Sequence, residues 1–246
     1  MTATDSKTDS AEKARRPLPW PIRFYRSDVG KKYVMAITGI VGLGFIVFHM
    51  LGNLHAFEGS HQLNEYAEGL REIGEPIAPR TMLVWIGRIG LLTALLLHVH
   101  SAFTLSRSNK AARGPVPYEN DRNYLAANYA SRTMGWTGVI VLLFLVWHLA
   151  DLTIGIELAN PDFSRGEVYA NLIASLERWP VFLLYLAAQG ALALHIWHGA
   201  WSLFQSIGVN NPRFNHWRSN FATGLATIVA FGYLTVPFSI MFGIIH

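Results

Sequence analysis

Six histidines fall within apolar stretches of the sequence: His49, His98, His100, His148, His195 and His198. An ionisable side chain at membrane depth is costly and usually functional, although a lone neutral imidazole can also serve as an interhelical hydrogen-bond partner. Four of the five apolar stretches carry at least one of these residues, which favours a shared chemical role. Because imidazole is a common ligand of metal ions and of haem iron, ligation is the first hypothesis.

The elements that would position these histidines are five apolar segments long enough to cross a bilayer. A hydrocarbon core of about 30 Å needs about 20 residues of helix. The segments lie at about residues 33–57, 81–106, 133–156, 179–209 and 221–245. Charged residues make up only 15% of the chain, against about 25% in soluble domains. We predict an all-α membrane protein with a five-helix transmembrane domain over residues 27–246, preceded by a polar, basic tail over residues 1–26.

The charges alternate between the loops. Basic residues concentrate before the first segment and in the loops after the second and fourth, while the other two loops are rich in glutamate and aspartate. The positive-inside rule then predicts a cytoplasmic N-terminus and an outer C-terminus. This placement accounts for the net charge of +4, so no nucleic-acid partner is expected. The absence of cysteine excludes disulfides and iron–sulfur ligation by this chain.

The depth of each histidine follows from the helical rise of 1.5 Å per residue. His49 and His148 lie roughly 24 Å and 22 Å above the inner surface, both in the outer half. His98 and His195 lie roughly 10–12 Å and 15–20 Å from that surface, a looser match in the inner half. The sequence therefore predicts two bis-histidine pairs, one above the other. Such pairs, without thiolate or carboxylate ligands, suit low-spin haem better than zinc.

Two ligand choices stay open from the pattern alone. His98 and His100 point about 200° apart and cannot both serve one haem. His195 and His198 share a helix face, so that one could bind the iron while the other meets a propionate or a quinone. Glycines such as Gly39 in these segments would let a helix backbone approach a macrocycle, or simply pack against another helix.

Two charged residues inside the segments have two interpretations each. Arg88 is either a propionate or quinone partner of the outer haem, or a side chain that snorkels to the interface. Asp151, one turn beyond His148, either orients a propionate through water or marks the end of the span.

Short motifs surround the histidines, in an order that is itself informative. They are Gly30-Lys-Lys, Met35-Ala-Ile-Thr-Gly39, Phe48-His-Met-Leu-Gly-Asn53, Leu97-His-Val-His-Ser-Ala-Phe-Thr-Leu105, Trp147-His-Leu-Ala150, Leu194-His-Ile-Trp-His-Gly-Ala-Trp-Ser202 and Gln205-Ser-Ile-Gly208. Taken together from about Ser27 to Ile245, they resemble the di-haem cytochrome b anchor subunit of succinate:quinone oxidoreductases and fumarate reductases.

The resemblance implies one axial ligand on each of the first four helices. His49 and His148 would bind the outer haem b and His98 and His195 the inner one, which favours His98 over His100 and His195 over His198. It also implies a multi-pass subunit of the plasma membrane that docks a flavoprotein subunit and an iron–sulfur subunit on its cytoplasmic face. Electrons from succinate would reach a membrane quinone through the haems, as in respiratory complex II of the tricarboxylic acid cycle.

No residue of this chain is expected to act on the dicarboxylate. Three alternatives remain beside the resemblance. The chain could serve a quinol:fumarate reductase running in the reverse direction, or anchor another membrane dehydrogenase as its cytochrome b. It could also be a transporter that uses its histidines as a proton relay.

Overall fold

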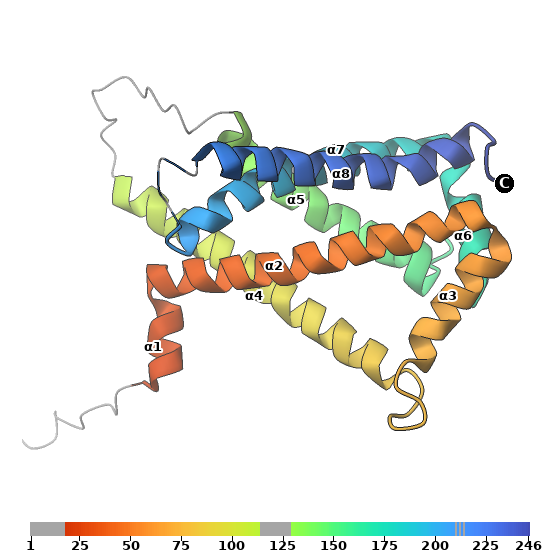
Figure 1. Ribbon diagram of the computed structural model, residues 1–246, viewed down its shortest axis with the longest axis horizontal. Coiled ribbons are helices and arrows are strands. Elements are labelled where there is room, and N and C mark those ends of the chain that lie inside the picture. Colours follow the sequence, from red (N-terminus) through yellow and green to blue (C-terminus); the bar gives the residue numbers. More distant parts are fainter. Residues whose placement is uncertain (1–17, 114–128, 210, 212, 214) are drawn as a thin grey trace, which may run out of the picture.

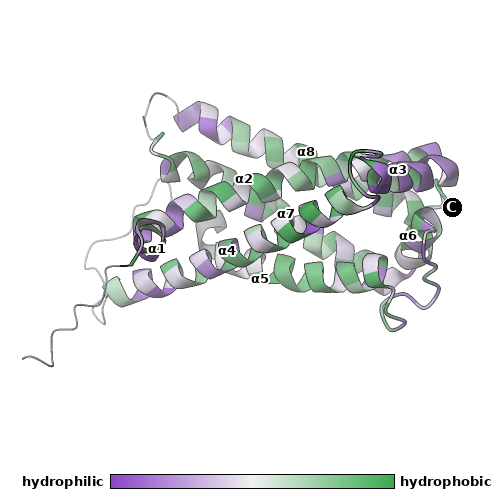
Figure 2. Ribbon diagram, turned by 90° about the horizontal axis from the view of Figure 1, so that it is seen from below, coloured by the Kyte–Doolittle hydropathy of each residue, from purple (hydrophilic) through white to green (hydrophobic). Residues whose placement is uncertain are grey.

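The computed structural model describes residues 18–113, 129–209, 211, 213 and 215–246, which are helical apart from turns and contain no strand. Five helices are long and apolar enough to cross a membrane. They are α2 (Asp28–Asn53), α4 (Met82–Arg113), α5 (Tyr129–Leu149), α7 (Trp179–Ser206) and α8 (Asn215–Met241). The prediction of an all-α membrane protein with five spans is confirmed. Figure 2 shows hydrophobic residues along these helices and hydrophilic ones toward their ends.

The helix ends differ most from the prediction at two places. Helix α4 continues to Arg113, and α8 begins at Asn215 instead of near residue 221. Hydropathy marks only the part of a helix that lies in hydrocarbon, whereas the hydrogen-bonded backbone continues into the polar residues beyond it. Residues 1–17 of the predicted tail lie outside the described residues. Its last part forms a short helix, α1 (Trp20–Arg26), that runs across the start of α2 (Figure 1).

The corner between α1 and α2 depends on Ser27 and Gly30. Ser27 has an extended backbone that ends α1, and its hydroxyl accepts a hydrogen bond of 3.0 Å from the Gly30 amide, capping α2. Asp28 in the first turn of α2 complements the helix dipole. A Cβ atom at Gly30 would overlap the carbonyl oxygen of Phe24. Only glycine therefore fits where the two helices meet at this angle.

At the opposite end, short helices connect the spans. Helix η1 (Leu54–Glu58) continues α2 into α3 (Ser60–Glu72), and a π-helical turn, η2 (Ala150–Ile154), follows α5. Helix α6 (Val168–Leu176) then packs against α3. These elements share one buried cluster with α7 and α8, made of Ala56, Leu63, Leu172, Leu176, Val181, Tyr185, Val236 and Ile240.

The spans form two hairpins and one bridging helix. Helix α2 packs along α4, and α5 packs along α7, while α8 packs along α7 and also contacts α2 (Figure 1). Close packing is found neither between α2 and α5 nor between α4 and α7 in the described parts of these helices. Helix α4 lies at the edge, since its apolar window has no buried residue. The four histidine-bearing spans are thus two adjacent pairs, joined by α8, by a direct contact between α2 and α7 and by the packing of α3 against α6.

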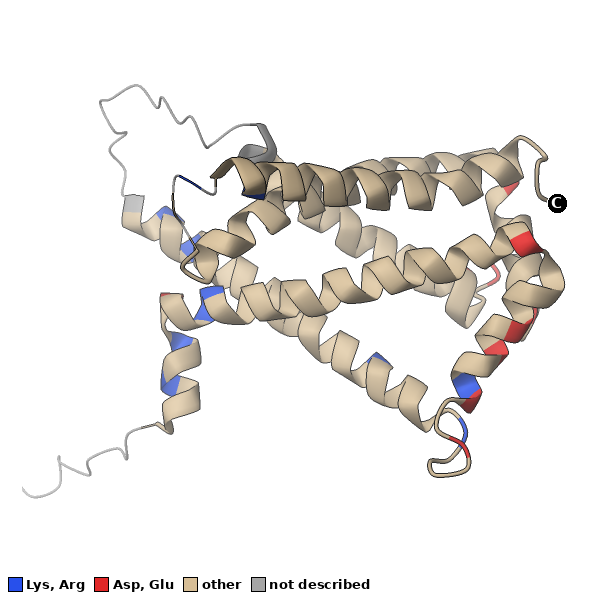
Figure 3. Cartoon of the chain, viewed as in Figure 1, with Lys and Arg blue, Asp and Glu red and all other residues tan. Residues whose placement is uncertain are grey.

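Charges separate to the two ends of the bundle. Figure 3 shows lysine and arginine on α1 and the start of α2, and a group of acidic residues on α3 at the far end. The acidic side chains of α3 are Glu65, Glu68 and Glu72. The loop residues 114–128, which include Arg122, lie outside the described residues. The charge pattern behind the predicted orientation is present in the fold, and the orientation itself stays a prediction.

The corner at Gly30 generates a stability prediction. We expect Gly30→Ala to lower the free energy of unfolding by about 1–3 kcal/mol, because the new methyl group meets rigid backbone at Phe24. The control is Gly224→Ala on α8, where an added Cβ would meet no atom within 4 Å. Both variants would be unfolded thermally in detergent. Equal midpoints for Gly30→Ala and Gly224→Ala would contradict the role assigned to this corner.

Candidate functional site

The predicted outer pair comes together in the fold. His49 on α2 and His148 on α5 have ring centroids 5.9 Å apart, with ring planes at 78°. Phe45 stacks on His49 at 5.3 Å, and Phe144 lies 5.7 Å from His148. Both imidazoles are half-buried. The structure therefore places these two rings face to edge in an aromatic setting, although their helices do not pack along each other.

The predicted inner pair also comes together. His98 on α4 and His195 on α7 have ring centroids 6.3 Å apart, with ring planes at 59°. The level of this pair follows from Thr38 on α2, which contacts His98 and precedes His49 by eleven residues, 49 minus 38. At 1.5 Å per residue the two pairs lie about 16 Å apart along the bundle.

A threonine hydroxyl supports each histidine of the inner pair. Thr38 Oγ1 lies 3.2 Å from Nδ1 of His98, and Thr137 Oγ1 lies 3.4 Å from Nδ1 of His195. Each hydroxyl also donates to a carbonyl of its own helix, at 2.7 Å to Val34 and 3.0 Å to Met134. Because the hydroxyl proton is used there, Nδ1 must donate to the oxygen. Nε2 of each ring is then left with a free lone pair, as a metal ligand requires.

A glycine follows each of these threonines and lets the histidine ring approach. A Cβ atom at Gly39 would lie 3.6 Å from Cε1 of His98, and one at Gly138 would lie 3.4 Å from Cε1 of His195. Elsewhere in these spans, a Cβ atom added at Gly42, Gly44, Gly87, Gly90, Gly135 or Gly190 would find no atom within 4 Å. The close approach of a histidine ring thus explains the glycines at positions 39 and 138.

Thr38 and Thr137 were missed by the sequence reasoning, although a signal was present. Thr-Gly stands eleven residues before the outer histidine on α2 (Thr38 to His49) and again on α5 (Thr137 to His148). This repeated spacing means that α2 and α5 each carry one outer histidine and one threonine that contacts an inner histidine. The two hairpins therefore repeat one arrangement.

A buried polar network stands behind His148. Its Nδ1 lies 3.2 Å from the hydroxyl of Tyr185, which donates to Asp151 at 2.8 Å. Ser175 donates to the same carboxylate oxygen at 2.6 Å, and Arg178 lies 3.6 Å from the other oxygen. Asp151 is fully buried. Asp151 lies three residues before the end of its span at Ile154, and its carboxylate lies among side chains of α6 and α7 and the loop between them.

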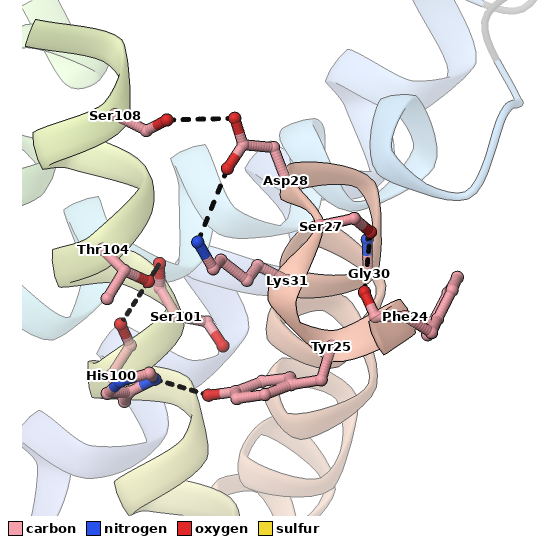
Figure 4. Close-up of polar contacts among 10 residues, drawn as sticks. All are labelled: Phe24, Tyr25, Ser27, Asp28, Gly30, Lys31, His100, Ser101, Thr104 and Ser108. Atoms are coloured by element: carbon pink, nitrogen blue, oxygen red, sulfur yellow. Dashed lines mark hydrogen bonds and ion pairs between the residues drawn. The ribbon is translucent and has the colours of Figure 1, made fainter. Parts of the chain in front are cut away.

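The remaining candidate residues lie apart from the paired rings. His100 is exposed and hydrogen-bonds through Nδ1 to the hydroxyl of Tyr25 on α1, at 2.5 Å (Figure 4). Arg88 is exposed and its guanidinium lies 5.1 Å from the ring centroid of Trp85. His198 is half-buried and makes neither a hydrogen bond nor a ring contact within the described part of the chain. The fold thus pairs His98, and not His100, with His195.

The number of possible ligands and the spacing of the rings indicate which kind of metal group the four paired imidazoles fit. No group of three or more histidine, cysteine, aspartate or glutamate side chains that could hold a metal ion occurs among residues 18–113, 129–209, 211, 213 and 215–246. A protein zinc site needs three or four such ligands, whereas haem iron needs only two axial ones. With a metal–nitrogen bond of about 2.0–2.1 Å and about 1.1 Å from nitrogen to ring centre, two opposed imidazoles have centroids about 6.3 Å apart. The inner pair, at 6.3 Å, matches that spacing, and the outer pair, at 5.9 Å, is about 0.4 Å closer.

Compared with protein-family models, with curated proteins and with solved structures, the chain gives no match. A functional interpretation therefore has to rest on its own residues and their geometry.

The contact between Thr137 and His195 generates a second stability prediction. Thr137→Val keeps the shape of the side chain but leaves Nδ1 of His195 without its acceptor. We expect the unfolding free energy to fall by about 0.6–1.7 kcal/mol, the range measured for hydrogen bonds between membrane helices. The control is Thr93→Val, because Thr93 donates only to the carbonyl of Ile89 in its own helix. A loss no larger than that of Thr93→Val, measured by denaturation in mixed micelles, would show that the bond to His195 contributes nothing.

Proposed function

We propose that this chain is the cytochrome b membrane-anchor subunit of a succinate:quinone oxidoreductase, with His49 and His148 as axial ligands of one b haem and His98 and His195 as those of a second. The observation that carries the proposal is the pair of facing imidazole couples, with centroids 5.9 and 6.3 Å apart, at two levels of an apolar bundle. One such couple is also typical of ordinary aromatic packing. Two couples on four spans, between helices that do not pack along each other, favour ligation.

Bound haem would supply one-electron transfer, and the chain's residues would supply ligands, orientation and an apolar surrounding. The hydroxyls of Thr38 and Thr137 support the inner ligands through Nδ1 and leave Nε2 for the iron. Phe45 and Phe144 flank the outer ligands. All four rings are only half-buried by this chain, so a further group has access to them.

The partners follow from charge and composition. The chain contains no cysteine, so an iron–sulfur cluster that delivers electrons must belong to another subunit. We propose that this iron–sulfur subunit and a flavoprotein subunit dock on the basic end near α1, which would face the cytoplasm of a plasma-membrane complex. The dicarboxylate chemistry belongs to those subunits, and a quinone reaches the anchor from the lipid. The same arrangement serves quinol:fumarate reduction when electrons flow in reverse.

His198 and Arg88 are proposed as secondary cofactor contacts. His198 lies one helical turn beyond His195, on the same face of α7, and is available to a haem propionate or a quinone. Arg88 sits against Trp85, so contact with a propionate would require its guanidinium to leave that ring.

Haem content tests the proposal directly. The purified complex should show b-type bands in a reduced-minus-oxidised spectrum and two haems per anchor chain by pyridine haemochrome. His49→Ala or His148→Ala should leave about half of that signal, because one axial ligand is lost. His55→Ala is the control, since His55 pairs with Glu58 beyond the end of α2. A colourless wild-type protein would favour a histidine proton relay, and an unchanged haem count in both variants would eliminate the outer pair.

The neighbouring histidines of α4 provide a sharper comparison. We expect His98→Ala to remove the inner haem, because its ring faces His195. His100→Ala should retain both haems, because His100 faces Tyr25 instead. Haem content and the spectrum of each variant decide the assignment. Equal haem loss from the two substitutions would refute it.

The partner subunits distinguish a succinate oxidoreductase from other cytochrome b anchors. A tagged anchor should co-purify with a covalent or tightly bound flavin, and succinate should reduce its b-type bands. Reduction by another donor in place of succinate would assign the anchor to a different membrane dehydrogenase.

A further inference from the structure

A buried carboxylate inside the third span takes no part in the proposed ligation of the haems. Asp151 has no exposed surface, and it lies in the π-helical turn η2, three residues after His148. Burying a carboxylate is unfavourable unless donors surround it, and π-helical turns within helices are frequent at functional sites. These two features together direct attention to what Asp151 contacts.

The contacts of Asp151 lead to one histidine. Tyr185 and Ser175 donate to Oδ2 at 2.8 and 2.6 Å, and Arg178 lies 3.6 Å from Oδ1. Because the Tyr185 hydroxyl donates to the carboxylate, it can only accept from Nδ1 of His148, 3.2 Å away. His148 therefore carries its proton on Nδ1 and directs Nε2 elsewhere.

The other three paired histidines lack this support. His98 and His195 meet threonine hydroxyls with no carboxylate behind them. His49 has ring contacts with Phe45, His148 and Tyr233, but no hydrogen bond to any described residue. Among the described residues, a carboxylate is therefore linked through a hydrogen-bonded hydroxyl to His148 and to none of the other three paired rings. Carboxylates that hold the second ring nitrogen of a ligand histidine fix its orientation and raise its basicity.

We propose that Tyr185 and Asp151 are positioning residues for His148, which hold its imidazole toward His49 and strengthen it as a donor to iron. The inference rests on the proposed function, in which His148 is an axial ligand. A stronger donor stabilises ferric iron more than ferrous iron. Loss of either residue should therefore raise the reduction potential of the outer haem and leave the inner haem unchanged.

The test uses the intact complex and three conservative variants. Tyr185→Phe removes only the hydroxyl and retains the ring that packs edge-on to Phe144 at 4.8 Å. Asp151→Asn removes the charge. Tyr233→Phe is the matched control, because Tyr233 lies 6.2 Å from the His49 ring but its hydroxyl donates to the carbonyl of Ile46 at 2.8 Å. Haem content is measured first, and wild type and control should each hold two haems.

A redox titration then follows both haems, and the outer component is identified as the one that His148→Ala removes. A tenfold preferential loss of ferric affinity corresponds to a rise of about 59 mV for one electron. We expect a shift of that order in the outer component for Tyr185→Phe and Asp151→Asn, and none for Tyr233→Phe. The low-spin ferric EPR signal of the outer haem should change as well, because it reports ligand orientation.

Unchanged outer potential and EPR signal in Tyr185→Phe, with both haems bound, would overturn the positioning role while the proposed function stood. A shift that Tyr233→Phe reproduces would overturn it too, as a mere packing effect. A wild-type complex without haem would refute the proposed function, and this inference with it. If the complex with Asp151→Asn does not assemble, Tyr185→Phe alone tests the positioning role.

Discussion

An imidazole inside a bilayer has to find a partner within the bundle, and this constraint organises the whole chain. Lipid offers nothing that can satisfy a ring nitrogen, so each membrane histidine must meet another polar group, a metal or water. Four of them meet in two couples, with ring centroids 5.9 and 6.3 Å apart. Hydrogen-bonding side chains support these couples: Thr38 and Thr137 contact one, and Tyr185, backed by Asp151, contacts the other.

The two hairpins repeat one design and then depart from it. In both, the threonine of a Thr-Gly pair on the first helix contacts the histidine of the second helix. The first helix carries its own histidine eleven residues after that threonine. The repeat places equal couples at two levels. The departure lies at the outer level, where the π-helical turn after α5 buries a carboxylate behind His148 and nothing comparable supports His49. Two similar histidine pairs are thereby given different electrostatic surroundings, which under the proposed function would separate the potentials of the two haems.

The edge position of α4 agrees with a bundle that is completed by other components. Its apolar window is unburied by the rest of the chain, yet it carries His98, which faces across to His195 on α7. An apolar surface of this kind is stable in lipid or against another apolar group. Basic residues gather at the α1 end of the bundle and acidic residues on α3 at the opposite end (Figure 3).

The sequence alone determined the five spans, because contact with lipid demands about 20 apolar residues in a helix whose backbone bonds are internal. It also indicated the outer couple, because helical rise converts residue number into depth. The rotation and tilt of each helix were beyond it, since these depend on side-chain packing between helices far apart in sequence. The residue pattern left His98 and His100 as alternatives and the resemblance favoured His98, and the tertiary structure turns His98 toward His195 and His100 toward Tyr25. It alone brought Asp151 to Tyr185 of a different helix, where Tyr185 and Ser175 donate to one carboxylate oxygen.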